Sequence, residues 1–357
     1  MRDISKAMEG EARKLQITGG STYIISLPRK WVTRNQLRKG SFLILREEGD
    51  GSLSLAPSGP AKQEKKEEAI IRVSKKDESG AIRKAVSAYL VGYNLIQVRA
   101  QGQERLSSLQ RNALKDFARR YLVGTEIVTD TPNELTLQIL LSYPELTVES
   151  SLRRMSIITS SMHRDSMTAL REIDHQLAKA VIDTDTEVDR FNLYIIRQLK
   201  LAIANPRIIT EIGLSNARDC LGYRLITKSV ERTADHAVSI AENVLMLKKR
   251  IDDEVLRKIE NMSTLAISAF EDTIDSLFKH DFNLAESVIE RAKEIAKLEK
   301  EAILLSQKIE IEEIASLRLL IESVRRTAEY ASDIAEIVLN LNIESVLDWP
   351  TSRTKHI

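Results

Sequence analysis

The sequence predicts a multidomain α+β protein in three parts: a β-rich amino-terminal domain over residues 1–58, a small α/β domain over residues 69–142, and an all-α pair of three-helix bundles after residue 150. Three patterns predict this. Short alternating strands lie near the amino end, strands and helices alternate in the middle, and apolar residues then recur every three or four positions. Aromatic residues are only 4% of the 357 residues, so the bundle cores should consist of aliphatic side chains.

The amino-terminal domain is expected to contain four short strands and one helix. The strands are expected at residues 14–18, 22–26, 42–46 and 52–55. Pro28 suits the first turn of a short helix that ends near Gln36, and Gly49-Asp50-Gly51 is the strongest turn signal in the chain. About 45 residues arranged in this way bury too little apolar surface to fold alone. A second copy is therefore expected to complete the core.

The amino end is basic, whereas the whole chain is nearly neutral. Residues 1–40 carry nine Lys and Arg residues against three acidic residues, whereas the net charge of the chain is +1. Such asymmetry indicates a polyanion as the partner of this end alone. The alternative is an ordinary solvated basic surface.

The order L-Q-I-T-G-G-S-T-Y-I-I-S-L-P-R-K-W-V, then L-R-K-G, then D-G-S-L-S-L-A-P resembles the AbrB/SpoVT swapped-hairpin domain. The resemblance implies that two chains interleave into one barrel-like homodimer that binds DNA. Many members carry an Arg directly after the first turn glycine, but here Ser21 follows Gly20, so the resemblance does not extend to the usual base contacts. The basic residues are instead expected to contact phosphates, which give affinity rather than sequence choice. These residues are Arg13, Lys14, Arg29, Lys30 and Arg34.

Residues 59–68 are expected to form a charged linker, because Ala is the only apolar residue type in this segment. After it, strands are expected at residues 69–73, 95–98, 125–129 and 135–141, and helices at 79–91 and 106–121. This alternation predicts a small α/β domain with a partly parallel sheet. It contains no glycine-rich phosphate loop and no arrangement of catalytic type. A spacer, a dimerisation domain and a sensor all fit it.

The carboxy-terminal half contains an internal repeat. Residues 229–245, S-V-E-R-T-A-D-H-A-V-S-I-A-E-N-V-L, match residues 323–339 with a shift of 94 and eleven identities. The segment before it repeats with a shift of 107, so the first copy has 13 extra residues before its last helix. The repeat predicts three-helix bundles over residues 150–249 and 253–342. The helices are expected at 151–179, 185–204, 216–249, 254–280, 283–308 and 311–342.

Within the first copy, residues 231–242, E-R-T-A-D-H-A-V-S-I-A-E, resemble the PhoU signature E-R-x-x-D-H-x-x-x-I-A-E. The PhoU family has two tandem bundles, as expected here. The resemblance implies a role in phosphate homeostasis, through control of phosphate uptake.

Two pairs of carboxylates have the spacing of one helical turn: Asp185 with Asp189, and Glu231 with Asp235. Like charges at this spacing repel each other, and neighbouring helices could bring all four together. Such clusters suit hard or borderline cations. Relatives in the PhoU family bind multinuclear metal clusters, often iron, so the resemblance makes these four residues candidate ligands for iron, manganese, magnesium or zinc. The alternative is that they are solvated acids paired with Lys and Arg.

The second copy lacks this set. The same shifts place Ala292, Ala296, Arg325 and Glu329 at the equivalent positions. Arg325 and Glu329 should form an ion pair within one helix, with no need for a metal. One bundle, rather than two, is therefore expected to bind metal.

The histidines do not indicate catalysis. His236 is expected to be a hydrogen-bonding structural residue, and His163 and His175 share no helical face and receive no role. The Glu-x-x-His spacing of di-iron bundles is absent, since Ala234 stands three residues after Glu231. A carboxylate–metal enzyme is the least favoured hypothesis, and the protein is expected not to be an enzyme.

The single cysteine, Cys220, cannot form an intrachain disulfide, and no apolar run approaches a membrane span or a signal sequence. A cytoplasmic location is expected. The leading hypothesis is a phosphate-responsive transcriptional regulator that binds DNA as a homodimer. The alternative is an accessory regulator that binds a phosphate transporter or a sensor kinase without touching DNA. The operator, the ion, direct phosphate binding and the role of residues 69–142 are left open.

Overall fold

The computed structural model describes residues 11–47, 51–58, 68–75, 77–102, 104–141, 146–306 and 311–348. Two compact units, Met1–Lys66 and Glu67–Ile357, are described separately. The expected turn residues Gly49 and Asp50, and the linker up to residue 67, lie outside the described residues.

The first unit consists of two antiparallel hairpins and a short helix. Its elements are β1 (Gln16–Thr18), β2 (Thr22–Ile24), α1 (Arg29–Arg34), β3 (Leu43–Glu47) and β4 (Leu53–Pro57). β1 pairs with β2, and β3 pairs with β4. Gly19 and Gly20 turn the first hairpin with φ values of 60° and 85°, which favour glycine. The predicted strands and helix are confirmed.

The first unit has no core of its own. None of its residues with a described side chain is buried. Phe42 is 81% exposed, Leu53 is 68% exposed and Leu15 is 66% exposed. Apolar side chains of this size are normally covered, so one copy of this unit leaves its apolar surface open to another chain.

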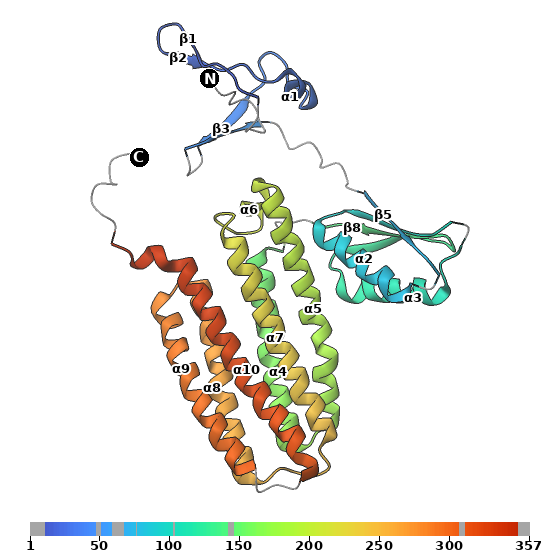
Figure 1. The fold of residues 1–357 in the computed structure, drawn as a ribbon, viewed down its shortest axis with the longest axis vertical. Helices are drawn as coiled ribbons and strands as arrows, with labels where there is room; N and C mark the ends of the chain where they lie inside the picture. Colours follow the sequence, from blue (N-terminus) through green and yellow to red (C-terminus); the bar gives the residue numbers. More distant parts are fainter. Residues whose placement is uncertain are drawn as a thin grey trace, which may run out of the picture. The chain divides into compact units, whose positions relative to one another are not determined.

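The second unit begins with a four-stranded sheet and two helices. Its elements are β5 (Glu68–Val73), α2 (Glu78–Val91), β6 (Leu95–Ala100), α3 (Ser108–Tyr121), β7 (Thr125–Asp130) and β8 (Glu134–Ile139). The strand order is β5-β6-β8-β7, with β5 and β6 parallel and the other pairs antiparallel. The predicted partly parallel sheet is confirmed. α2 and α3 lie on one face of the sheet (Figure 1) and cover a core that includes Tyr89, Ile96 and Leu137.

The rest of the chain forms two three-helix bundles that pack side by side, with α7 against α10 and α4 against α8 (Figure 1). The first bundle comprises α4 (Val148–Glu172), α5 (His175–Ala204) and α7 (Asp219–Met246), and the second comprises α8 (Asp253–Lys279), α9 (Phe282–Ser306) and α10 (Ile311–Asn342). A short 3₁₀ helix (Ile343–Val346) follows. Val230, Ala234 and Ile240 on the predicted stripe of α7 are fully buried, which confirms the periodicity argument.

The first turn between helices lies earlier than predicted. The helix expected over 151–179 ends at Glu172, and α5 begins at His175 rather than at residue 185. Ile173 takes a left-handed conformation with φ 51°, and the Asp174 carboxylate accepts the backbone N–H groups of Gln176 and Leu177. The prediction was wrong because apolar periodicity continues across this turn, whereas the helix cap is a local signal.

The same turn recurs in the second copy, 107 residues later. His280 has φ 53°, and Asp281 accepts the backbone N–H of Leu284 at 3.0 Å. The repeat therefore includes the turn as well as the helices.

The 13-residue insertion contains a helix that the sequence did not predict, α6 (Pro206–Glu211). Ile208, Ile209 and Ile212 from this segment are buried in the bundle core. The insertion is thus part of the packed structure.

Arg197 joins the α/β domain to α5. Its guanidinium is fully buried and donates to the carbonyls of Tyr89, Gly92 and Tyr93 and to Asn94 Oδ1, the last at 2.7 Å. Carbonyls at the carboxy-terminal end of a helix carry partial negative charge, which a cation stabilises. The α/β domain and the first bundle therefore share a fixed junction.

None of the helices that the structure describes has both the length and the apolar character that a membrane crossing requires.

Candidate functional site

The structure brings the four predicted carboxylates together on neighbouring helices. Asp185 and Asp189 lie one turn apart on α5, and Glu231 and Asp235 lie one turn apart on α7. α5 packs directly against α7. The other three carboxylates all repel the charge of Asp185, so the four residues form one acidic cluster, called here the α5–α7 cluster.

Burial and mutual repulsion hold protons on this cluster. Burial is the largest cause that raises the pKa of Asp185 to about 7, and the charges of Asp189, Asp235 and Glu231 raise it further. Burial and the charge of Glu231 also raise the pKa of Asp235 to about 6 and move the pKa of Asp189 upward. At neutral pH, full ionisation of the cluster therefore costs free energy unless a cation compensates it.

One lysine partly supplies this compensation. Lys228 forms an ion pair with Glu231, which is only 9% exposed. Asp185 has no such partner: its Oδ1 atom is buried and accepts no hydrogen bond in the described part of the chain. Buried polar atoms are rarely left in this state, so Asp185 is the position in the cluster that most needs a further donor or a cation.

The donor chemistry of the cluster fits a hard or borderline cation, because all four ligands would be carboxylate oxygens. The arrangement is not a preformed cage, since no three His, Cys, Asp or Glu side chains of the described residues are gathered closely enough to hold a metal ion. Binding would require the four side chains to turn toward one point and Glu231 to share or release Lys228.

On the equivalent surface of the second bundle, the side chain of Arg325 supplies a positive charge. Ala292 and Ala296 line a hollow of about 510 Å³ together with Arg325 and Glu329. Arg325 forms an ion pair with Glu329 on the same helix, as predicted, and another with Glu299 of α9 at 2.9 Å. The position equivalent to Glu231 therefore carries a paired cation, although Asp333 and Glu336 also line this hollow and burial and the charges of Glu336 and Glu329 raise the pKa of Asp333.

His163, to which the sequence assigned no role, has a buried structural position. It is fully buried where the two bundles meet, with Nε2 at 2.8 Å from Ser263 Oγ and Nδ1 at 3.5 Å from Thr327 Oγ1. Burial, with a smaller contribution from Arg164, lowers its pKa to about 4. Its place on the buried stripe of α4, four residues after Thr159, could have revealed this role.

His236, expected to form a hydrogen bond, packs against an aromatic ring. Its ring centroid lies 5.7 Å from that of Tyr330, and its Nδ1 atom is buried with no hydrogen-bond partner among the described residues. Burial lowers the pKa of this histidine. A neutral structural ring is consistent with both observations.

The five candidate DNA-contacting residues are all exposed. Arg13 and Lys14 precede β1, whereas Arg29, Lys30 and Arg34 lie on α1. Arg13 also forms an ion pair with Glu11 at 2.5 Å, which a DNA phosphate would have to replace. These side chains are accessible to a polyanion, but they are distributed over a unit that has no core of its own.

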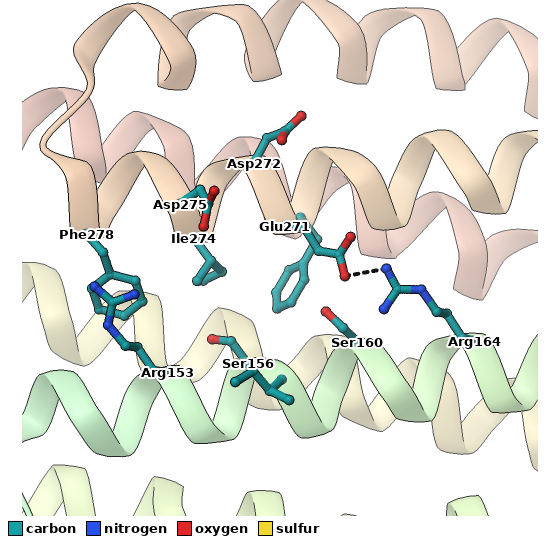
Figure 2. Close-up of a pocket in the computed structure, with 11 residues that line it drawn as sticks. Arg153, Ser156, Ser160, Arg164, Glu271, Asp272, Ile274, Asp275 and Phe278 are labelled. Atoms are coloured by element: carbon teal, nitrogen blue, oxygen red, sulfur yellow. Dashed lines mark hydrogen bonds and ion pairs between the residues drawn. The ribbon is translucent and has the colours of Figure 1, made fainter.

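A groove of about 560 Å³ runs between α4 and α8, at the joint of the bundles (Figure 2). The Arg153 guanidinium stacks 3.7 Å from the ring centre of Phe278, and Arg164 reaches across to Glu271 at 2.5 Å (Figure 2). Both arginines are thus already partnered within the protein. These contacts stabilise the joint and indicate no ligand.

Two protein families match the chain. The PhoU domain matches residues 152–244 and 259–338, and the family described as antidote-toxin recognition MazE, bacterial antitoxin, matches residues 16–63. Residues 64–151, which include the α/β domain, lie between these matches.

Curated relatives and solved structures agree with the PhoU match. The phosphate-specific transport system accessory protein PhoU homolog of Clostridium acetobutylicum is 22% identical over 200 residues, which cover 54% of this chain and 90% of the relative. The homolog of Borreliella burgdorferi is 26% identical over 192 residues, which cover 50% and 84%. The crystal structure of PhoU from Pseudomonas aeruginosa matches with a TM-score of 0.50 and 19% identity over 56% of this chain and 96% of that chain. At this identity the structural match shows a shared bundle fold.

Proposed function

We propose that this chain, which carries two PhoU domains behind an amino-terminal domain of the MazE type, is a phosphate-responsive regulator that binds DNA and controls phosphate uptake. Its relatives are named as accessory proteins of phosphate-specific transport. The tandem PhoU bundles support the same pathway here. The additional amino-terminal domain supports the proposal that the protein acts by binding DNA.

The observation that carries the DNA-binding proposal is the open core of the first unit. Its apolar side chains are exposed in a single chain, as expected of a domain that a second copy completes. A dimer doubles the exposed basic residues and places two equivalent sets on one particle. Paired basic surfaces suit duplex DNA, whose phosphates attract Lys and Arg at any sequence.

We further propose that the α5–α7 cluster binds iron or a divalent cation. The cluster has more carboxylates than cationic partners, and Asp185 Oδ1 has no hydrogen-bond partner in the described part of the chain. A bound cation would supply positive charge, and Asp185, Asp189, Glu231 and Asp235 would hold it. Because the carboxylates must lose protons to bind it, affinity should rise with pH.

One experiment tests both parts. The full-length protein is purified without chelator, its metal content is measured, and the same sample is used to capture genomic DNA fragments for sequencing. The proposal expects fragments that cluster upstream of phosphate-uptake genes. Failure to retain any DNA below about 100 mM salt, where phosphate contacts alone should hold, would contradict it.

A second function has a specific observation in its favour. The position after the first turn glycines holds Ser21 instead of the arginine of many swapped-hairpin domains. An accessory regulator of a phosphate transporter or sensor kinase, with an amino-terminal unit that only dimerises, fits this departure. Loss of DNA retention together with retained dimerisation would favour this function.

A further inference from the structure

Three arginines from three separate segments face one pocket between the α/β domain and the first bundle. Arg120 lies at the end of α3, Arg154 on α4 and Arg190 on α5. The pocket has a volume of about 370 Å³. Phe191 and Ile158 form part of its wall, so the pocket combines strong positive charge with an apolar surface.

Within the described residues, these three arginines have no carboxylate in direct contact. Arg120 donates to the Thr186 hydroxyl at 3.2 Å, and the Arg154 guanidinium lies 5.8 Å from the ring centre of Phe191. Glu187, the one acidic residue of the lining, also makes no ion pair among the described residues.

The other arginines of α4 form ion pairs with carboxylates, whereas Arg154 forms none among the described residues. Arg153, next to Arg154 on α4, is paired with Glu149, and Arg164 is paired with Glu271. Neighbouring like charges repel unless an anion lies among them. The three guanidinium groups around one pocket therefore point to an anionic ligand.

The walls of the pocket are fixed before any ligand binds. The buried Arg197 holds the α/β domain on α5 through the end of α2, and Arg190 lies about two helical turns before Arg197 on the same helix. Glu187, Arg190 and Phe191 share one face of α5 because they are three and four residues apart. Because the helices that carry the arginines are fixed relative to one another, only the exposed side chains have to be ordered when a ligand binds.

We propose that this pocket binds a phosphorylated small molecule. Guanidinium groups match phosphate geometry through paired N–H donors, and three of them suit a group with two or more negative charges. The volume falls within the range of about 300–1,000 Å³ for small-molecule sites, which often lie between domains. It leaves room for an organic body against Phe191 and Ile158. A phosphate ester should therefore bind more tightly than free phosphate.

This site gives the α/β domain a role as one wall of a ligand sensor. The proposal depends on neither DNA binding nor a metal at the α5–α7 cluster. It is tested by isothermal titration of the full chain with inorganic phosphate, phenyl phosphate, AMP and adenosine. Comparison of inorganic phosphate with phenyl phosphate and AMP shows whether the pocket prefers free phosphate or a phosphate ester. Adenosine, which has no phosphate, shows whether the phosphate group is required for binding.

AMP or phenyl phosphate is expected to bind with Kd below about 1 mM, more tightly than inorganic phosphate, with no heat from adenosine. Arg154→Gln and Arg190→Gln should each weaken binding about tenfold or more, equivalent to at least about 1.4 kcal/mol. Arg190→Lys keeps the charge but loses the paired donors, so it should give an intermediate affinity.

Arg153→Gln is the matched control, since this residue is paired outside the pocket and its loss should leave affinity unchanged. Melting temperatures of all variants check that each is folded. The proposal is overturned if neither AMP nor phenyl phosphate binds with a Kd below about 1 mM. It is equally overturned if Arg154→Gln and Arg190→Gln bind the probes as the unmodified chain does.

Discussion

Arg325 of α10 donates through Nε to Glu299 of α9 at 2.9 Å, at the repeat position where the first bundle has Glu231. The second copy of the repeat thus has an arginine at the position where the first copy has a carboxylate of the α5–α7 cluster. The two bundles share a fold, but the first has four carboxylates at the positions where the second has Ala292, Ala296, Arg325 and Glu329.

The metal proposal predicts that Asp235→Asn removes the bound ion. The substitution deletes one charge of the cluster and barely changes the volume. The variant should lose both the metal and any metal-dependent gain in melting temperature, because a ligand that binds only the native state stabilises it by mass action. Elemental analysis of protein purified without chelator measures the loss.

Glu329→Gln is the control in the second bundle. It removes a surface ion pair, at a cost of roughly 0–1 kcal/mol, and should leave the metal content unchanged. Two results would contradict the metal proposal. One is an equal metal content in both variants and the unmodified chain, and the other is no metal in the unmodified chain after reloading with iron, manganese, magnesium and zinc.

The raised pKa of Asp185 predicts how metal-free stability depends on pH. Its pKa rises from 3.8 to about 7 on folding, so the folded state binds the proton more tightly than the unfolded state does. The stabilisation is complete below pH 4 and is lost as pH rises toward 7. Because the group is partly solvated, we expect a loss of about 1–2 kcal/mol.

Asp185→Asn should reduce this dependence, leaving the part contributed by Asp235 and Asp189, and should make the metal-free protein more stable than the unmodified chain at pH 8. Urea unfolding at several pH values, with chelator present, measures both curves. Parallel curves would show that repulsion at Asp185 does not influence stability.

The open core of the first unit predicts a dimer that depends on its apolar strand residues. Leu15 and Ile17 alternate onto one face and are 66% and 62% exposed in the single chain. Replacing both with Asp should convert the full-length dimer into a monomer in analytical ultracentrifugation, with the melting of the bundles unchanged. Gln16→Asp, on the opposite face of β1, should remain dimeric. A monomeric unmodified chain would contradict the prediction.

The bundles could be predicted from sequence because their packing repeats every three or four residues, as at Val230 and Ala234. The α5–α7 cluster could be placed because the spacing of Asp185 and Asp189 matches that of Glu231 and Asp235. Local turns and contacts between distant segments were harder to predict from the sequence. The turn at Ile173 interrupts an apolar pattern that continues across it.

Arg197 shows the long-range limit most clearly. An arginine is normally an exposed residue, and the partners that bury this one lie more than 100 residues earlier in the chain. Arg120, Arg154 and Arg190 likewise meet only after the α/β domain docks. No sequence window contains either arrangement.

The DNA-binding proposal predicts a steep dependence on salt. Arg29→Ala should weaken binding on all DNA sequences alike, because a phosphate contact carries no base information. It should also reduce the slope of log affinity against log salt by about 0.9 for each phosphate that the variant no longer neutralises. Fluorescence anisotropy with two unrelated duplexes measures the effect. A change confined to one duplex would indicate base recognition instead.

The Arg197 junction predicts a large loss of stability when its charge is removed. Arg197→Met keeps the apolar stem but leaves the carbonyls of Gly92 and Tyr93 and the Asn94 side chain without their donor in a buried site. A buried polar group without its partner costs about 1–3 kcal/mol, so the variant should unfold at a clearly lower urea concentration. Arg190→Met, on the exposed side of the same helix, should shift stability by no more than about 0.5 kcal/mol. Similar urea midpoints for the two variants would show that the α/β domain is held by its other contacts with α5.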